Sequence, residues 1–110
     1  MNVLRKNGQF REVYQRGERV VCTSFLVFFL RGEQTNEASF GFVASKRVGN
    51  AVKRNRAKRV MREACRSVAD KLIHQNIWIV IVARPALLNT SYQEVLIDLE
   101  KSLREYQLIR

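Results

Sequence analysis

The chain has 110 residues, a typical length for one domain, so we expect a single domain over residues 1–110. Hydrophobic residues make up 46% of it, which is enough for one core and argues against a disordered chain. The formal net charge of +10 makes the folded state repel itself, which favours a polyanionic partner such as nucleic acid.

The sequence shows no targeting signal, and its cysteines do not indicate an oxidising compartment. No apolar run approaches the ~18 residues of a membrane span, and the first ten residues do not resemble a signal peptide. The two cysteines, Cys22 and Cys65, are too few for a disulfide scaffold and lack metal-ligand spacing. We expect a cytoplasmic protein with no membrane partner and no small-molecule cofactor.

The first half of the chain predicts one helix and two strands. Residues 7–16 form a short helix, with Asn7 as its N-cap and Gly17 as its stop. Residues 19–30 are rich in β-branched and aromatic types and predict a strand. Near the end of this strand, both alternating faces carry apolar residues. The face turned away from the core is therefore either buried by another layer or left as an aromatic surface. Residues 31–38 predict a polar hairpin loop that leads to a strand over residues 39–45.

The second half predicts a long helix, a strand and a final helix. Asn50 is the expected N-cap of a helix over residues 51–73. Residues 77–83, IWIVIVA, predict a central strand that Arg84 and Pro85 end. Ser91 opens an amphipathic helix, with Glu94 as its capping-box partner. The order α-β-β-α-β-α predicts an α/β (α+β) two-layer sandwich, a small sheet with helices packed on it.

Positive charge is concentrated on the long helix. Residues 46–66 carry nine basic residues and one acid, Glu63. An ordinary solvated helix face would mix the two signs for i,i+4 pairing, whereas here like charges repel one another opposite an apolar arc. Arginine forks grip phosphate oxygens in pairs, and Asn55 can contact a 2′-OH or a base edge. The candidate RNA-binding residues are Lys53, Arg54, Asn55, Arg56, Lys58, Arg59, Arg62 and Arg66.

The segment SKRVGNAVKRNRAKRVMRE, residues 45–63, resembles the signature of the bacterial ribonuclease P protein family. Arg54-Asn55-Arg56 resembles the family's "RNR" motif, and the resemblance extends over essentially the whole chain. Arg47 stands where many members have lysine, and Ala57 replaces a larger aliphatic residue.

The resemblance implies a sandwich with a left-handed β-α-β crossover. It implies that the motif helix contacts the catalytic RNA subunit of ribonuclease P, and that a cleft between the first helix and the sheet binds the single-stranded 5′ leader of precursor tRNA. The cleft aromatics would be Phe10, Tyr14 and Phe28, with Lys46 and Asn50 near a basic rim. The reaction is phosphodiester hydrolysis at the mature tRNA 5′ end, with Mg²⁺ held mainly by RNA.

The same residues also allow purely structural roles, and the chain allows other functions. Phe10, Tyr14 and Phe28 could be ordinary core residues, although aromatic side chains beside basic ones commonly hold single strands by stacking. An autonomous nuclease would need an acid/base pair or a carboxylate cluster, but the acids are scattered, so we expect no catalytic residue in the chain. Composition alone also allows a ribosomal protein or an RNA chaperone.

Overall fold

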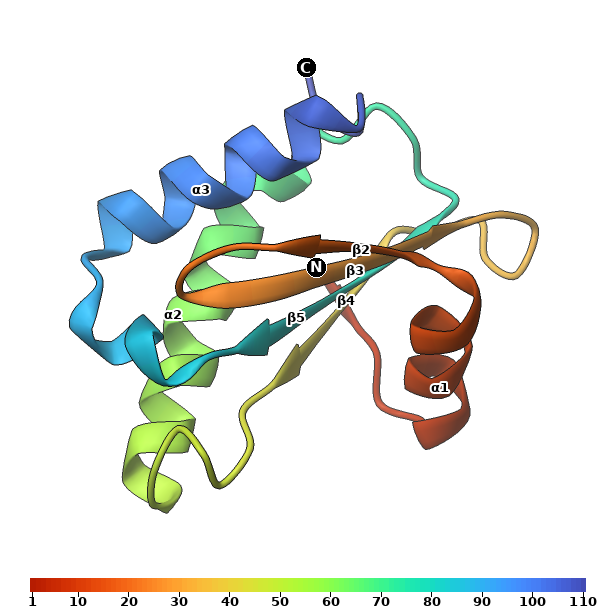
Figure 1. Ribbon diagram of the computed structural model, residues 1–110. Coiled ribbons are helices and arrows are strands. Elements are labelled where there is room, and N and C mark those ends of the chain that lie inside the picture. Colours follow the sequence, from red (N-terminus) through yellow and green to blue (C-terminus); the bar gives the residue numbers. More distant parts are fainter.

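The computed structural model, which describes residues 1–110, is built on one five-stranded sheet (Figure 1). The strands are β1 (Asn2–Val3), β2 (Glu18–Val21), β3 (Phe25–Arg31), β4 (Ser39–Val43) and β5 (Ile77–Ala83), and they lie in the order β1-β4-β5-β3-β2. The central strand β5 is parallel to β4 and antiparallel to β3. Its continuously apolar sequence, IWIVIVA, suits this position, because both of its faces are covered.

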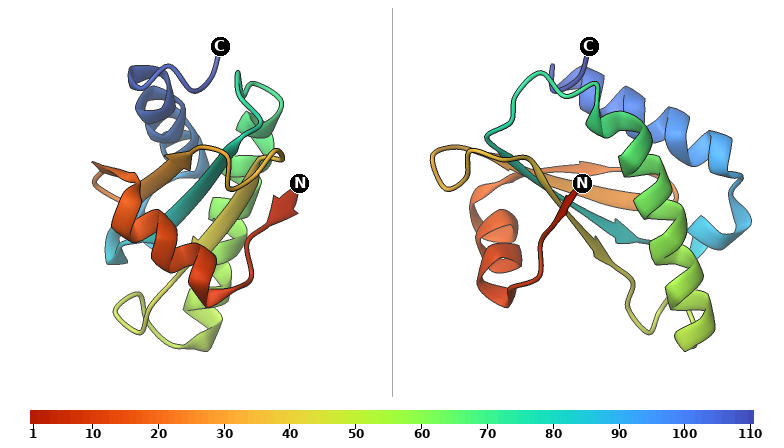
Figure 2. Two further views of the ribbon diagram at one scale, coloured as in Figure 1. Left: turned by 90° about the vertical axis from the view of Figure 1, so that its right-hand side faces the viewer. Right: turned by 180° about the vertical axis from the view of Figure 1, so that it is seen from behind.

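Helices cover both faces of the sheet, as Figures 1 and 2 show. Helix α1 (Asn7–Arg16) lies on one face, and α2 (Ala51–Ala69) and α3 (Tyr92–Glu105) lie on the other. A 3-10 helix, η1 (Pro85–Asn89), joins β5 to α3. No helix combines the length and the apolar character needed to cross a membrane.

The two faces of β3 are buried in different cores. Phe25, Val27 and Phe29 point into the larger core under α2 and α3. Leu30 belongs to a smaller core under α1, and Phe28 packs against it. Both faces of β3 are therefore apolar because a helix layer covers each side of the sheet.

Helix α2 connects the parallel neighbours β4 and β5. Seen from the α2 side (Figure 2, right) and turned so that both strands point upward, β5 lies to the left of β4. The crossover is therefore left-handed, as the family resemblance implies and against the strong right-handed preference of such units.

Two expectations about the ends of α1 had different outcomes. The prediction of Asn7 as N-cap is wrong, because Lys6 occupies that position and the Gln9 Oε1 atom accepts from the Lys6 N–H at 3.1 Å. Gly17 ends the helix as predicted, its N–H donating to the Val13 carbonyl at 2.9 Å. A Cβ at this position would lie 2.5 Å from the Phe29 carbonyl oxygen, so only glycine lets α1 end this close to β3.

The single strand predicted over residues 19–30 is instead an antiparallel pair, β2 and β3. The Cys22 N–H donates to the Phe25 carbonyl at 2.9 Å to close the turn between them. Arg84 supports this turn, its N–H donating to the Ser24 carbonyl and its Nη1 to the Cys22 carbonyl, both at 3.0 Å. The loop over residues 31–38 is present but forms no hairpin, because β5 lies between β3 and β4.

The N-caps predicted at Asn50 and Ser91 are confirmed. The capping box with Glu94 is not, because no bond returns from the Ser91 N–H to the Glu94 side chain, and one helix boundary also differs. Asn50 accepts from the Lys53 N–H at 3.0 Å, and Ser91 accepts from the Glu94 N–H at 3.2 Å. Helix α2 ends at Ala69 rather than at residue 73. Leu72 pairs with Ile109 in an isolated bridge instead, so tertiary pairing ends the helix before its apolar pattern does.

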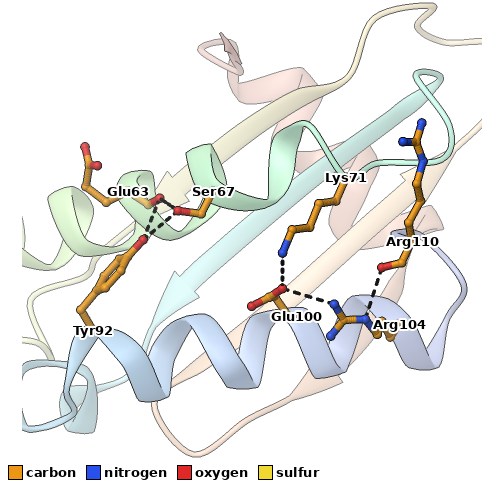
Figure 3. A network of polar contacts seen from close by, with 7 residues as sticks. All are labelled: Glu63, Ser67, Lys71, Tyr92, Glu100, Arg104 and Arg110. Carbon is orange, nitrogen blue, oxygen red and sulfur yellow. Dashed lines mark hydrogen bonds and ion pairs between the residues drawn. The ribbon is translucent and has the colours of Figure 1, made fainter.

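A polar network fixes α3 against α2 (Figure 3). The Tyr92 hydroxyl donates to the Glu63 carbonyl at 3.2 Å and lies 2.9 Å from the Ser67 hydroxyl. The Lys71 Nζ atom donates to the Glu100 carboxylate at 2.7 Å, and Arg104 approaches the same carboxylate. These contacts, together with the apolar core beneath, hold the C-terminal part of α2 and the residues just after it against α3.

Candidate nucleic-acid interface

The basic side of α2 divides into exposed and half-buried residues. The helix buries Ala57, Met61, Ala64, Cys65 and Val68 against the sheet and α3. The exposed members of the candidate set are Lys53, Asn55, Arg56, Arg59 and Arg66, and the half-buried members are Arg54, Lys58 and Arg62. The exposed members present charge and hydrogen-bonding groups to the solvent along the length of the helix.

Contacts within the chain orient two of the half-buried members, Arg54 and Arg62. Arg54 donates to the Gly49 carbonyl at 3.1 Å. The Arg62 guanidinium lies 5.4 Å from the centre of the Phe42 ring, a cation–π distance. Arg62 therefore leans toward β4 rather than standing in the middle of the solvent face, where a helical wheel places it.

A hollow of about 360 Å³ opens beside Lys58; we call it the aromatic hollow. It is lined by Asn7, Phe10 and Tyr14 from α1, Phe42, Val43 and Ala44 at the end of β4, and Lys58 from α2. The hollow thus unites two of the predicted cleft aromatics with a lysine that the sequence assigned to the motif helix. None of its lining residues is acidic.

The position of Phe10 depends on Gly41. A Cβ built on Gly41 would lie 2.5 Å from Cε1 and 2.8 Å from Cζ of the Phe10 ring. The ring therefore lies directly on the backbone of β4, and the absence of a side chain at Gly41 makes room for it. Because Phe10 lines the aromatic hollow, this contact positions part of the wall of the hollow.

Tyr14 and Phe28 form an edge-to-face pair with ring centroids 4.9 Å apart. Phe28 is half-buried and supports Tyr14 from β3 without lining the hollow itself. Tyr14 remains 41% exposed, more than a core residue would be. Partial burial raises the pKa of its hydroxyl above the ordinary value, so Tyr14 stays protonated at neutral pH and keeps a hydrogen-bond donor.

The two residues predicted at the basic rim lie outside the aromatic hollow. Lys46 and Asn50 are exposed in the connection between β4 and α2, and neither lines the hollow. The Asn50 side chain caps α2. The basic group at the hollow is Lys58, the eighth residue of α2, which reaches the hollow because that end of α2 lies beside β4.

An apolar row crosses the sheet on the α1 side, beyond the area that α1 covers. Strand pairing aligns Val43 with Val82, Val82 with Leu26, and Leu26 with Val21. The first three are half-buried and Val21 is 57% exposed. Val43 lines the aromatic hollow, whereas the other three line a second one, the distal hollow, of about 430 Å³.

Comparison with known proteins agrees with this geometry. A family model described as ribonuclease P matches residues 1–107. The chain belongs to the ribonuclease P protein family. It is 36% identical to the ribonuclease P protein component of Listeria welshimeri, over 84% of this chain and 76% of that protein. It is 35% identical to the corresponding protein of Fusobacterium nucleatum, over 99% and 100% of the two chains.

The fold also resembles solved structures of ribonuclease P proteins. The RNase P protein of Staphylococcus aureus superposes with a TM-score of 0.85 over 100% of this chain and 99% of its own, at 24% identity. Family members are subunits of the ribonuclease P ribonucleoprotein, which processes tRNA 5′ ends with catalysis in its RNA. Membership thus assigns the chain an RNA partner and decides against a ribosomal protein or an RNA chaperone.

Some residues at the candidate site carry little signal in the sequence. Asn7 and Val43 line the aromatic hollow, yet one resembles a helix cap and the other a core strand residue. Arg84 lines the distal hollow, and its one local signal is its position immediately after a buried strand. No three His, Cys, Asp or Glu side chains form a group that could hold a metal ion.

Proposed function

We propose that this chain holds two RNAs at once. In this proposal, the exposed basic residues of α2 bind the catalytic RNA subunit of ribonuclease P, and the aromatic hollow binds the 5′ leader of precursor tRNA. The observation that carries the proposal is the shared lining of the hollow by Phe10, Tyr14 and Lys58. A leader strand in the hollow would lie directly beside the helix that contacts the RNA subunit.

The basic helix suits a folded RNA surface. Arg56 and Arg59 are exposed, and arginine forks can each grip two phosphate oxygens. Asn55, exposed immediately before Arg56, can donate and accept toward a 2′-OH or a base edge. Binding through phosphates releases counterions, so the affinity for RNA should fall steeply with salt.

The aromatic hollow suits unpaired nucleotides. Phe10 rests on Gly41 and Tyr14 is braced by Phe28, so both rings are held in place before any base stacks on them. Lys58 is positioned to meet a backbone phosphate at the same place. Stacking on aromatic rings beside a cation tolerates any base, as leaders of varied sequence require.

The chemical step in this proposal is hydrolysis of the phosphodiester at the mature tRNA 5′ end. Mg²⁺ prefers hard oxygen ligands, including phosphates, and we place it mainly on the RNA subunit. The chain itself would contribute no catalytic residue. Its side chains would orient the precursor by holding the leader against the RNA subunit.

The test compares the protein with and without its RNA. Highly purified protein with Mg²⁺ should leave precursor tRNA intact, and adding the RNA subunit should give cleavage at one position. The reconstituted enzyme should also bind precursor tRNA more tightly than mature tRNA, because only the precursor has a leader. Cleavage that survives rigorous removal of RNA, or equal binding of the two tRNAs, would contradict the proposal.

A further inference from the structure

We propose that a groove between the edge strand β2 and helix α3 docks an extended basic segment of a partner protein, which pairs with β2 as an additional strand. We call this hollow, of about 220 Å³, the edge groove. Its lining includes Val20 and Val21 from β2 and Asp98, Lys101 and Glu105 from α3. Strand β2 is the last strand of the sheet, at the edge opposite β4, so the edge groove lies away from the aromatic hollow.

The outer edge of β2 has free backbone groups. The Cys22 N–H donates to the Phe25 carbonyl at 2.9 Å, and in an antiparallel ladder every second residue bonds to the neighbouring strand. The backbone of Val20 therefore also faces β3, whereas Arg19 and Val21 direct their N–H and C=O groups away from the sheet. No strand other than β3 pairs with β2. A strand laid along this edge would satisfy these groups.

Helix α3 forms the second wall of the edge groove. The Cys22 Sγ and Ser102 Oγ atoms lie 3.1 Å apart and join the end of β2 to α3. Val20 and Cys22 pack against the larger core, so apolar groups close the floor of the groove. Val21 is 57% exposed, which leaves the edge open to an incoming strand.

The charge of the lining favours a basic occupant. The edge groove has two carboxylates, those of Asp98 and Glu105, and one cation, Lys101. Of the four hollows in the structure it alone has more acidic than basic side chains, because the largest has equal numbers and the aromatic and distal hollows have no acid. Neither Asp98 nor Glu105 forms an ion pair within the chain, so both are available to a lysine or arginine of a partner.

A partner protein suits this site better than RNA or a second copy of the chain. The Asp98 and Glu105 carboxylates would repel phosphates. Two copies, each with a net charge of +10, would repel each other. A protein bound along β2 would leave the aromatic hollow, at the opposite edge of the sheet, open to RNA.

The experiment measures binding of a fluorescent hexapeptide of alternating lysine and valine to the intact chain by anisotropy, in about 0.15 M salt, which screens long-range repulsion. Asp98→Asn and Glu105→Gln should each weaken binding by roughly 2- to 5-fold, as for exposed ionic contacts. Val21→Pro removes an outward N–H without breaking a bond to β3 and should weaken binding by roughly 3- to 10-fold. Glu94→Gln removes a charge from α3 outside the groove and should have no effect.

Two controls separate strand pairing from charge attraction and from RNA binding. A hexapeptide with proline in place of valine keeps the lysines but lacks those N–H groups, so it should bind more weakly by roughly 5-fold or more. Asp98→Asn and Glu105→Gln should leave precursor tRNA binding to the reconstituted enzyme unchanged.

Four outcomes would overturn the proposal. They are equal binding of the two peptides, full peptide binding by both the Asp98→Asn and the Glu105→Gln protein, weaker precursor tRNA binding by these variants, and dimerisation of the chain that Val21→Pro abolishes. The last would place a second copy on β2. If Val21→Pro fails to fold, the Asp98 and Glu105 variants still decide the question, because exposed carboxamides leave the core intact.

Discussion

Tyr14 of α1 and Lys58 of α2 line the same hollow, although their helices lie on opposite faces of the sheet. They meet around the outer edge of β4. Strand β1 pairs only with Ser39 and Phe40, so the rest of β4 forms the edge of the sheet. Because β1 is short, it leaves the end of β4 unpaired, and the aromatic hollow lies at this unpaired edge, where residues from both faces of the sheet line it.

Removing the Tyr14 ring should selectively weaken the binding of precursor tRNA. A base–aromatic stack typically contributes ~1–3 kcal/mol, so Tyr14→Ala should reduce binding of precursor tRNA to the reconstituted enzyme by roughly 5- to 150-fold. Mature tRNA should bind almost unchanged. Tyr14→Phe, which keeps the ring against Phe28, is the matched control and should retain most of the affinity. Equal losses for both tRNAs, with a lower melting temperature, would make Tyr14 a structural residue only.

A methyl group at Gly41 should displace Phe10 from the strand. The ring atoms that it would meet are at the far end of a side chain, so Gly41→Ala should shift the ring at a modest cost in stability. The preference for precursor over mature tRNA should then fall. Gly8→Ala is the control, because a Cβ there meets nothing within 4 Å. If the Gly41→Ala protein keeps its full preference for the precursor, the position of Phe10 against Gly41 is not needed for leader binding.

Exposed arginines of α2 should determine the salt dependence of RNA-subunit binding. If Arg54, Arg56, Arg59 and Arg62 belong to a contact with about 5–6 phosphates, the log–log salt slope should be roughly −4 to −5. Replacing Arg56 and Arg59 alone, both exposed, should reduce the slope by about 1.4–1.8 and leave the melting temperature unchanged. The measurement is a titration of RNA-subunit binding at several salt concentrations. An unchanged slope would exclude these two arginines from the interface.

The ion pair of Lys71 with Glu100 should make stability depend on acid pH. The hydrogen bond from Lys71 lowers the pKa of the Glu100 carboxyl below its ordinary value. A lowered folded-state pKa adds stability above the unfolded-state pKa, and this stability is lost as pH falls through the folded-state pKa. Glu100→Gln should therefore unfold more easily in urea at pH 7, by ~0.5–1 kcal/mol, with the difference shrinking below about pH 4. Glu33→Gln, an exposed loop change, should show no such trend.

Local chemistry was enough to predict the elements that carry the charge. The caps at Asn50 and Ser91, the stop at Gly17 and the basic side of α2 all follow from residues within a few positions of one another. Hydrogen bonds at helix ends and the 3.6-residue period are short-range, so the sequence determines them directly.

Tertiary structure alone decided which distant groups meet. Insertion of β5 between β3 and β4 aligns Val43, Val82, Leu26 and Val21, and no local pattern announces that register. The turn at residues 22–24 forms where Arg84 bonds to it from the far end of β5. Lys58, rather than Lys46 or Asn50, reaches the aromatic hollow because α2 packs beside the open edge of β4. Strand pairing and helix packing join segments far apart in the chain, so the site they create cannot be derived from the neighbours of any one residue.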